Sequence, residues 1–381
     1  MVGGGGSAAF HLTQSLRRAN NVVHVITPRT GGSAPGSTYP TSTREYFLAQ
    51  RRLVAASRSI ERDSCSQPDV IVTPDLFSAP ASRVLARRHG VPNVVVLCQS
   101  MRDRCWFYEE APVETAPGVQ ATTRELVQLE EYAVRTASHL IALSGWVKQR
   151  IGLGYNVNPQ HCTTILPGLP EFDDITPFSR IETSPAQLGE FVVVFVGRLV
   201  VEKGVRLLPR TVANLRDSGV PIKLIVLGDG PERSFLEQAA IAHGLTRSMQ
   251  IRGRVDHDEV LPQLRRADAG IIPSLDEPLG FVALEMMSAS LPLVASAAGG
   301  LAELIRPDID GLLVRLEREP AAIARNAAAL SHALKRLYQD LALRQRLGES
   351  GYGRGVLEFS QTRYGSRLTD VLKRLVESPT S

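Results

Sequence analysis

The chain has 381 residues, which is long for one domain and comfortable for two. Its hydrophobic fraction of 43% and charged fraction of 22% are near globular averages, so we do not expect a disordered chain. The net charge of +4 is spread over both halves without a basic stripe, which argues against a nucleic-acid partner. Because no run of about 18 apolar residues occurs, we expect no transmembrane segment, and we do not favour peripheral membrane contact.

Four cysteines and the N-terminal residues predict the compartment. Cys65, Cys98, Cys105 and Cys162 show neither CxxC spacing nor the density of a disulfide framework. Met1 leads directly into the glycines of Gly3–Gly6, without the charged and apolar segments of a signal peptide. We therefore expect a cytoplasmic protein.

Short apolar runs alternate with helical stretches along the first 170 residues. A helix over Ala8–Arg18 follows the glycines at once, so the first strand of a doubly wound domain is expected to be missing. Strands are then predicted at Val22–Thr27, Val70–Thr73, Asn93–Leu97, His139–Leu143 and Thr163–Leu166. Most runs are unbroken rather than alternating, which is typical of parallel strands covered by helices on both faces.

A proline-rich segment, Pro167–Gly189, interrupts this rhythm and is predicted to be a linker. Strands resume at Phe191–Val196, Ile222–Leu227, Met249–Arg252, Ala269–Ile272 and Pro292–Ala295, and helical stretches follow at Pro320–Leu347 and Ser360–Val376. The pattern predicts an α/β chain of two Rossmann-like, doubly wound domains that face a cleft. We place the domains at residues 1–175 and 176–355, followed by a last segment, 356–381.

The strongest motif runs from Glu277 through Gly280 to Glu285, after the strand Ala269–Ile272. Gly280 is expected to open a helix whose first N–H groups point toward the loop, and such a helix end binds anions. The two carboxylates would border one cleft at different depths. The alternative is a first-turn acid followed by a solvated helical glutamate.

A second motif, from Gly197 to Gly204, follows the strand Phe191–Val196. Gly197 allows a sharp turn, and Arg198 and Lys203 would reach the carboxyl end of the sheet. Two cations there suit a diphosphate, because Arg donates to paired oxygens and Lys adds a point charge. The alternative is a surface turn with an ion pair between Glu202 and Lys203.

Two further signals are weaker. The glycines of Gly3–Gly6 could admit a phosphate or a sugar against bare backbone, although taken by themselves they are better explained as a tag remnant or a flexible chain start. Asp256 and Asp258 resemble a metal-binding Asp-x-Asp pair. Asp256 with Glu259 fits a helix capping box better, so we predict no metal site.

Together these motifs resemble glycosyltransferase family 4. The matching segments are the Gly197–Gly204 motif, Leu227-Gly-Asp-Gly-Pro-Glu232, the pair Glu277 and Glu285, Leu291-Pro-Leu-Val-Ala-Ser296, and Gly299-Gly300 with Glu303. The family consists of retaining, metal-independent enzymes of the GT-B fold. The resemblance also implies that the last segment crosses back to the first domain. It is densest from Phe191 to Val314.

By resemblance, a UDP- or GDP-sugar would bind the second domain, and an unidentified acceptor the first. Arg198 and Lys203 would hold the diphosphate as it leaves, and Glu277 would contact the hydroxyls of the transferred sugar. These three are the expected catalytic residues. The remaining donor-binding positions are expected at Gly197, Val255, Gly280, Phe281, Val282, Glu285, Gly4 and Gly5, with Glu285 on the ribose and Val255 near the base.

The chain departs from the family pattern after Asn93–Leu97. Many relatives have a histidine there that meets the sugar, whereas this chain has Cys98-Gln99-Ser100. Gln99 is the expected substitute donor, and Gln99 and Arg102 are the expected acceptor-binding residues. Two alternatives stay open. One is another reaction on the same architecture, that of a sugar-nucleotide epimerase or a phosphorylase. The other, which the absent histidine and first strand suggest, is a degenerate, non-catalytic donor-binding protein.

Overall fold

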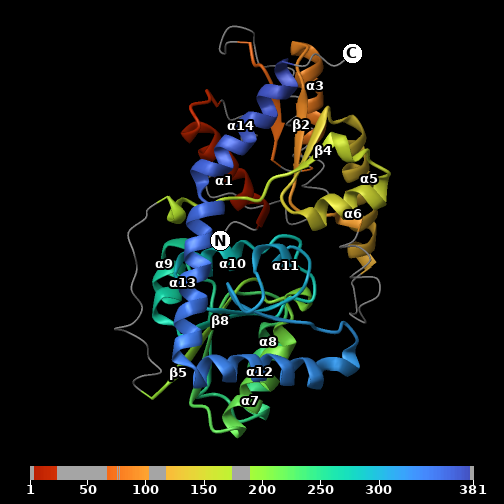
Figure 1. The fold of residues 1–381 in the computed structure, drawn as a ribbon. Helices are drawn as coiled ribbons and strands as arrows, with labels where there is room; N and C mark the ends of the chain where they lie inside the picture. The colour runs from red at the N-terminus through yellow and green to blue at the C-terminus, as the bar shows by residue number, and fades with distance from the viewer. Residues whose placement is uncertain are drawn as a thin grey trace. The chain divides into compact units, whose positions relative to one another are not determined.

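The computed structural model describes residues 4–23, 67–74, 76, 78–102, 117–173 and 189–377. The chain forms two compact units. Unit 1 is the segment Gly168–Ser360, and unit 2 combines Val2–Pro167 with Gln361–Ser381 (Figure 1). Among the described residues, no helix is long and apolar enough to cross a bilayer.

The described strands of unit 2 form a parallel sheet in the order β1-β2-β3-β4. They are β1 (Ile71–Thr73), β2 (Asn93–Leu97), β3 (His139–Ala142) and β4 (Cys162–Thr164). All five residues of β2 are buried, as expected for a strand covered on both faces. The strand predicted at Thr163–Leu166 is observed at Cys162–Thr164, so it ends earlier than expected, although Ile165 still donates to the Ala142 carbonyl at 2.9 Å. The prediction at Val22–Thr27 lies largely outside the described residues.

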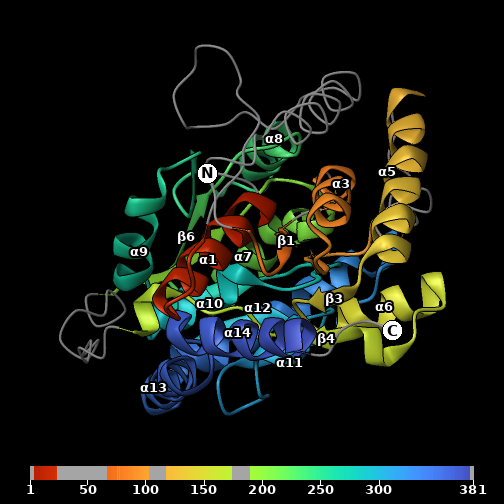
Figure 2. The same ribbon diagram turned by 90° about the horizontal axis from the view of Figure 1, so that it is seen from above.

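The first and last helices of the chain pack side by side in unit 2 (Figures 1 and 2). They are α1 (Gly4–Arg18) and α14 (Gln361–Glu377). Gly365 permits their close approach, because a Cβ there would overlap the Ser15 carbonyl. Asn21 Nδ2 also donates to Thr369 Oγ1 at 2.7 Å. Unit 2 also contains the helices α3 (Ala79–His89), α5 (Pro117–Thr136) and α6 (Gly145–Tyr155).

Unit 1 contains a parallel sheet in the order β10-β9-β8-β5-β6-β7. Its strands are β5 (Phe191–Val196), β6 (Ile222–Leu227), β7 (Met249–Gly253), β8 (Ala269–Ile272), β9 (Leu293–Ser296) and β10 (Leu312–Val314). The chain leaves β5 toward β6 on one side and later returns to place β8 on the other. The strand order therefore reverses between β5 and β8, and ligands bind such sheets outside the carboxyl ends of the strands at this point.

Helices cover the sheet of unit 1 and bury the core. They are α7 (Leu208–Asp217), α8 (Arg233–Ala242), α9 (His257–Arg266), α10 (Phe281–Ser288), α11 (Leu301–Leu304), α12 (Ile323–Gln339) and α13 (Leu341–Glu358). Alternate residues of β5 share one apolar cluster with α7 and α12. The predicted helical stretch Pro320–Leu347 is two helices, because Asp340 ends α12 and its carboxylate caps α13 through Leu343 N–H at 2.8 Å.

Candidate functional site

Two segments of unit 1 meet where the strand order reverses. One follows β5 (residues 197–204) and the other follows β8 (residues 273–280). The Glu202 carbonyl accepts hydrogen bonds from Leu275 N–H at 2.8 Å and Asp276 N–H at 3.2 Å. Gly204, at φ 64°, lies so close to the Pro273 carbonyl that a Cβ would overlap it. The two motifs that the sequence singled out are therefore parts of one structure.

A short ion pair joins these segments. Lys203 Nζ lies 2.6 Å from Glu277 Oε2, and Ser274 Oγ donates to the same oxygen at 3.1 Å. Glu277 is 9% exposed. The alternative pairing of Lys203 with Glu202 is wrong, because the carboxylate of Glu202 lies 3.4 Å from Arg198 instead. The structure thus brings a cation and an acid together at the edge of the sheet where a ligand is expected.

Arg198 differs from Lys203 in its surroundings. Half of the Arg198 side chain is exposed, and its guanidinium lies 3.4 Å from Glu202 Oε1. An ion pair of this length and exposure contributes little to stability. The guanidinium can therefore turn toward an anionic ligand at small cost.

Helix α10 begins beside this ion pair. Gly280 precedes it in the left-handed region at φ 97°, and a Cβ there would lie 2.7 Å from the Leu301 side chain. Phe281 and Val282 form the half-buried first turn. Gly280 is placed as predicted, at the start of a helix whose N-terminal end carries partial positive charge.

Glu285 lies one turn into α10 and is largely buried rather than solvated, so the alternative of a solvated helical glutamate is wrong. Burial, with a smaller contribution from the nearby charge of Glu171, raises the pKa of Glu285 to about 7. Near neutral pH this carboxyl can therefore either donate or accept a hydrogen bond.

The glycines after β6 hold the neighbouring loops together. Gly228 N–H donates to the Gly253 carbonyl at 2.8 Å, and Leu199 N–H donates to the Asp229 carbonyl at 2.9 Å. A Cβ on Gly228 would overlap the Gly197 carbonyl. The Gly-Asp-Gly sequence is therefore explained by packing of backbone on backbone. Val255, the predicted neighbour of the base, is half-buried two residues beyond β7.

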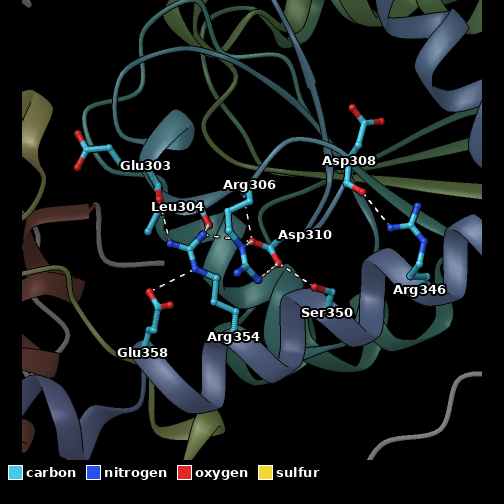
Figure 3. Close-up of polar contacts among 9 residues, drawn as sticks. All are labelled: Glu303, Leu304, Arg306, Asp308, Asp310, Arg346, Ser350, Arg354 and Glu358. Carbon is cyan, nitrogen blue, oxygen red and sulfur yellow. Dashed lines mark hydrogen bonds and ion pairs between the residues drawn. The ribbon is translucent and has the colours of Figure 1, made fainter.

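Figure 3 shows a polar cluster that anchors α11 behind the site. Buried Asp310 accepts from Arg306 at 2.7 Å, from Ser350 at 3.0 Å and from Arg354 at 3.2 Å. Burial raises the pKa of Asp310, but these hydrogen bonds outweigh it and hold the pKa below its usual value. Arg354 of α13 also donates to the Leu304 carbonyl at 2.8 Å, at the carboxyl end of α11.

The opposite end of α11 supports the site directly. Gly300, just before α11, donates its N–H to the Glu277 carbonyl at 2.8 Å. Leu301 packs against Gly280. The Asp310 cluster therefore fixes the backbone on which Glu277 and Gly280 depend.

In unit 2 the expected acceptor residues lie on the turn after β2. Gln99 Nε2 lies 3.7 Å from Met101 Sδ. Arg102 donates to the Gly154 carbonyl and lies over the Tyr155 ring, so its guanidinium caps the end of α6. Gly4 and Gly5 lie in the first turn of α1, not in a turn before it, because the helix begins earlier than predicted.

Sequence reasoning missed Glu130, which is fully buried in α5 beneath this turn. Its carboxylate accepts from Met101 N–H at 2.7 Å and from Tyr155 Oη at 2.6 Å. A signal was available, since Glu130 continues the apolar stripe of Leu126 and Val134 at helical spacing.

The predicted capping box before α9 is also wrong. Asp256 precedes the helix, but its side chain makes no capping hydrogen bond. Its backbone carbonyl accepts from Glu259 N–H at 3.0 Å instead. Within the described ranges, no three His, Cys, Asp or Glu side chains are grouped as metal ligands.

Comparisons with known families match almost the whole chain. Residues 2–171 match the model described as Glycosyltransferase Family 4, and residues 180–354 match the one described as Glycosyl transferases group 1. A glycogen synthase of Mycobacterium tuberculosis is 27% identical over 94% of this chain and 88% of its own. An alpha-maltose-1-phosphate synthase of the same organism is 25% identical over 97% and 96%.

Solved structures are similar in fold over most of their length. Anabaena HepE in complex with UDP-glucose has a TM-score of 0.70 at 19% identity and covers 98% of this chain and 97% of its own. Sucrose-phosphate synthase of Thermosynechococcus elongatus has a TM-score of 0.71 at 21% identity and covers 90% and 82%. At these identities the likeness shows the fold alone.

Proposed function

The chain belongs to glycosyltransferase family 4 and is a glycosyltransferase of the GT-B fold, and on this premise we propose its reaction. It transfers a sugar from a UDP- or GDP-sugar to an acceptor hydroxyl, with retention of the anomeric configuration and without a metal ion. Unit 1 binds the donor, and unit 2 binds the acceptor.

The ion pair of Lys203 and Glu277 carries this proposal. It lies at the edge of the unit 1 sheet where the strand order reverses, between the end of β5 and the start of α10. Lys203 and Arg198 would stabilise the charge that builds on the diphosphate as it leaves, assisted by the N-terminal end of α10. Glu277 would then accept hydrogen bonds from the hydroxyls of the transferred sugar.

The acceptor hydroxyl would attack the face that the diphosphate leaves. The departing phosphate oxygen would take the acceptor proton, so that no side-chain base is required. Glu285, with a pKa raised to about 7, would hydrogen-bond the ribose. The solved complexes of HepE with UDP and with UDP-glucose favour a uridine donor.

Titration calorimetry with UDP and GDP, each with and without EDTA, tests the donor site. We expect one nucleotide to bind, with the same Kd in EDTA, and Lys203→Ala to weaken that binding at least about tenfold, as the loss of a charged hydrogen bond implies. Lys223→Ala is the matched control, since Lys223 of the same unit pairs with Glu190 at the surface. Binding of neither nucleotide to the unaltered chain would refute the proposal.

The stereochemistry needs a separate measurement. Proton NMR of the sugar released from UDP-glucose or GDP-glucose reports its anomeric configuration before mutarotation. The α-anomer is expected from an α-linked donor. A β-anomer would exclude retention.

A further inference from the structure

A single buried carboxylate organises the turn that follows β2 in unit 2. Glu130 is 0% exposed. Besides its contacts with Met101 N–H and Tyr155 Oη, it accepts from Arg102 N–H at 3.3 Å and from Ser100 Oγ at 3.4 Å. Three of its four donors belong to consecutive residues of this turn, and they meet the carboxylate where helical structure begins at Met101.

These contacts stabilise the N–H groups at the start of the helical turn. The N–H groups that open a helical turn have no partner within it, and a carboxylate satisfies them through charge-assisted bonds. The fourth donor, Tyr155, ties the turn to α6. Burial and the charge of Glu130 raise the pKa of Tyr155 far above its usual value, so its hydroxyl stays a donor.

The location of this turn suggests why it is held in place. It leaves the carboxyl end of β2, where parallel α/β sheets present ligand-binding groups. Gln99 stands between β2 and the residues that Glu130 holds. An apolar side chain at position 130 could fill the same buried space, but it could not accept hydrogen bonds from the N–H groups of residues 101 and 102.

On the premise of the glycosyl transfer proposed above, we propose that Glu130 is a positioning residue, which holds the turn of residues 98–102 so that Gln99 meets a substrate hydroxyl. Glu130 touches no substrate itself. Its effect on turnover passes through the backbone of Ser100, Met101 and Arg102.

The test compares Glu130→Gln with Tyr155→Phe and with the control Glu131→Gln. Glu131 is the next residue of the same helix, but it is exposed and pairs with Arg135 at 2.8 Å. Hydrogen exchange of the Met101 and Arg102 amides should accelerate at least about tenfold in Glu130→Gln, because the two amides bond to different carboxylate oxygens and glutamine keeps only one, uncharged acceptor oxygen. Tyr155→Phe keeps both backbone contacts and should change exchange less. Should Glu130→Gln fail to fold, Tyr155→Phe is compared with Glu131→Gln alone: having lost the 2.6 Å bond to Glu130, it should speed exchange at residues 101 and 102 and lower kcat, each by a smaller factor.

Activity is measured as UDP release from UDP-glucose with water as acceptor, or as GDP release from GDP-glucose. In Glu130→Gln we expect kcat to fall about 10- to 100-fold, as a small misplacement of a substrate-contacting group produces. The KM for the donor and the Kd of the nucleotide should stay within about threefold, since the nucleotide is bound by the other unit.

The exchange, turnover and binding measurements together distinguish failure of the positioning role from failure of the proposed glycosyl transfer. Unchanged exchange at residues 101 and 102, or unchanged kcat with faster exchange, overturns the positioning role. An equal loss in nucleotide affinity and kcat also overturns it, because the effect would then be general. If the unaltered chain binds no nucleotide but exchange still accelerates in Glu130→Gln, the glycosyl transfer fails while the hold on the turn stands.

Discussion

The ammonium group of Lys203 lies 2.6 Å from the carboxylate of Glu277, although 74 residues separate them in the chain. The adjacency of β5 and β8 brings them together, since each residue stands in the segment that follows one of these strands. Each group holds the other in the orientation that a donor sugar phosphate would meet. Loss of either should therefore affect the reaction more than the fold.

Glu277→Gln should lower kcat about 10²- to 10³-fold, which is typical when one preorganised polar group is lost from a transition-state site. Steady-state turnover of the nucleotide sugar measures this. Glu237→Gln is the control, since this carboxylate of α8 in the same unit pairs with Arg233 at 2.8 Å on the surface. A Glu277→Gln variant with unaltered kcat would remove Glu277 from the reaction.

Glu285 predicts how stability changes with pH. Its pKa is raised from 4.5 to about 7 on folding, so the native state binds more protons than the unfolded state between these values. Stability from this group is complete below about pH 4.5 and is lost as pH rises through 7, with a total of about 3 kcal/mol.

Urea unfolding at pH 5 and pH 8 measures this loss. Glu285→Gln cannot ionise, so the variant should lose less stability than the unaltered chain over this interval. Glu237→Gln, at an exposed ion pair with Arg233, is the control and should change nothing. Equal pH slopes for the unaltered chain and Glu285→Gln would contradict the prediction.

Two glycines with nearly the same φ allow the cost of a left-handed backbone to be measured apart from the cost of a steric overlap. Gly204 has φ 64° and faces the Pro273 carbonyl, whereas Gly90 has φ 68° and nothing within 4 Å of its Cβ position. Gly90→Ala should cost about 1–2 kcal/mol, the penalty of the left-handed conformation. Gly204→Ala should destabilise unit 1 further and weaken nucleotide binding, because the segment carrying Lys203 must move.

Thermal unfolding and nucleotide titration check both glycine variants. The prediction requires the two to differ. Equal losses of stability, with unchanged nucleotide binding in Gly204→Ala, would mean that the contact with Pro273 has no energetic importance.

Asp310 should be much more sensitive than its neighbour Asp308. Asp310 is buried and accepts from Arg306, Arg354 and Ser350 (Figure 3). Asp308 instead forms an exposed ion pair with Arg336 at 3.1 Å. Asp310→Asn should cost about 3–5 kcal/mol, because it leaves buried charge unpaired, and Asp308→Asn less than about 1 kcal/mol.

The pH dependence of this effect has the opposite sign to that of Glu285. The pKa of Asp310 is lowered on folding, so its contribution exists above its unfolded pKa of 3.8 and disappears as pH falls through the folded value. Denaturant unfolding at pH 7 compares the two variants. Similar losses in both would show that the cluster does not anchor α11.

Long unbroken runs of buried residues were predictable as strands. β5 and β6 begin and end where the sequence placed them, since all six residues of β5 and five of the six in β6 are apolar, Lys223 being the exception, and such runs leave few alternatives. β10 was missed because its three residues, Leu312–Val314, are too few to show a period. The break between α12 and α13 was missed because a lone Asp340 inside a helical pattern signals a cap only weakly.

The site residues likewise fall into those predictable from sequence and those revealed only by the tertiary structure. Sequence alone determined that Arg198, Lys203, Glu277 and Gly280 follow the ends of strands, because local runs and glycines define those ends. Tertiary structure alone decided that Lys203 pairs with Glu277 rather than Glu202, and that Glu130 lies beneath the turn after β2. Such partners depend on which strands are neighbours and which helix covers them, and those relationships arise from burial of the whole sheet rather than from any local pattern.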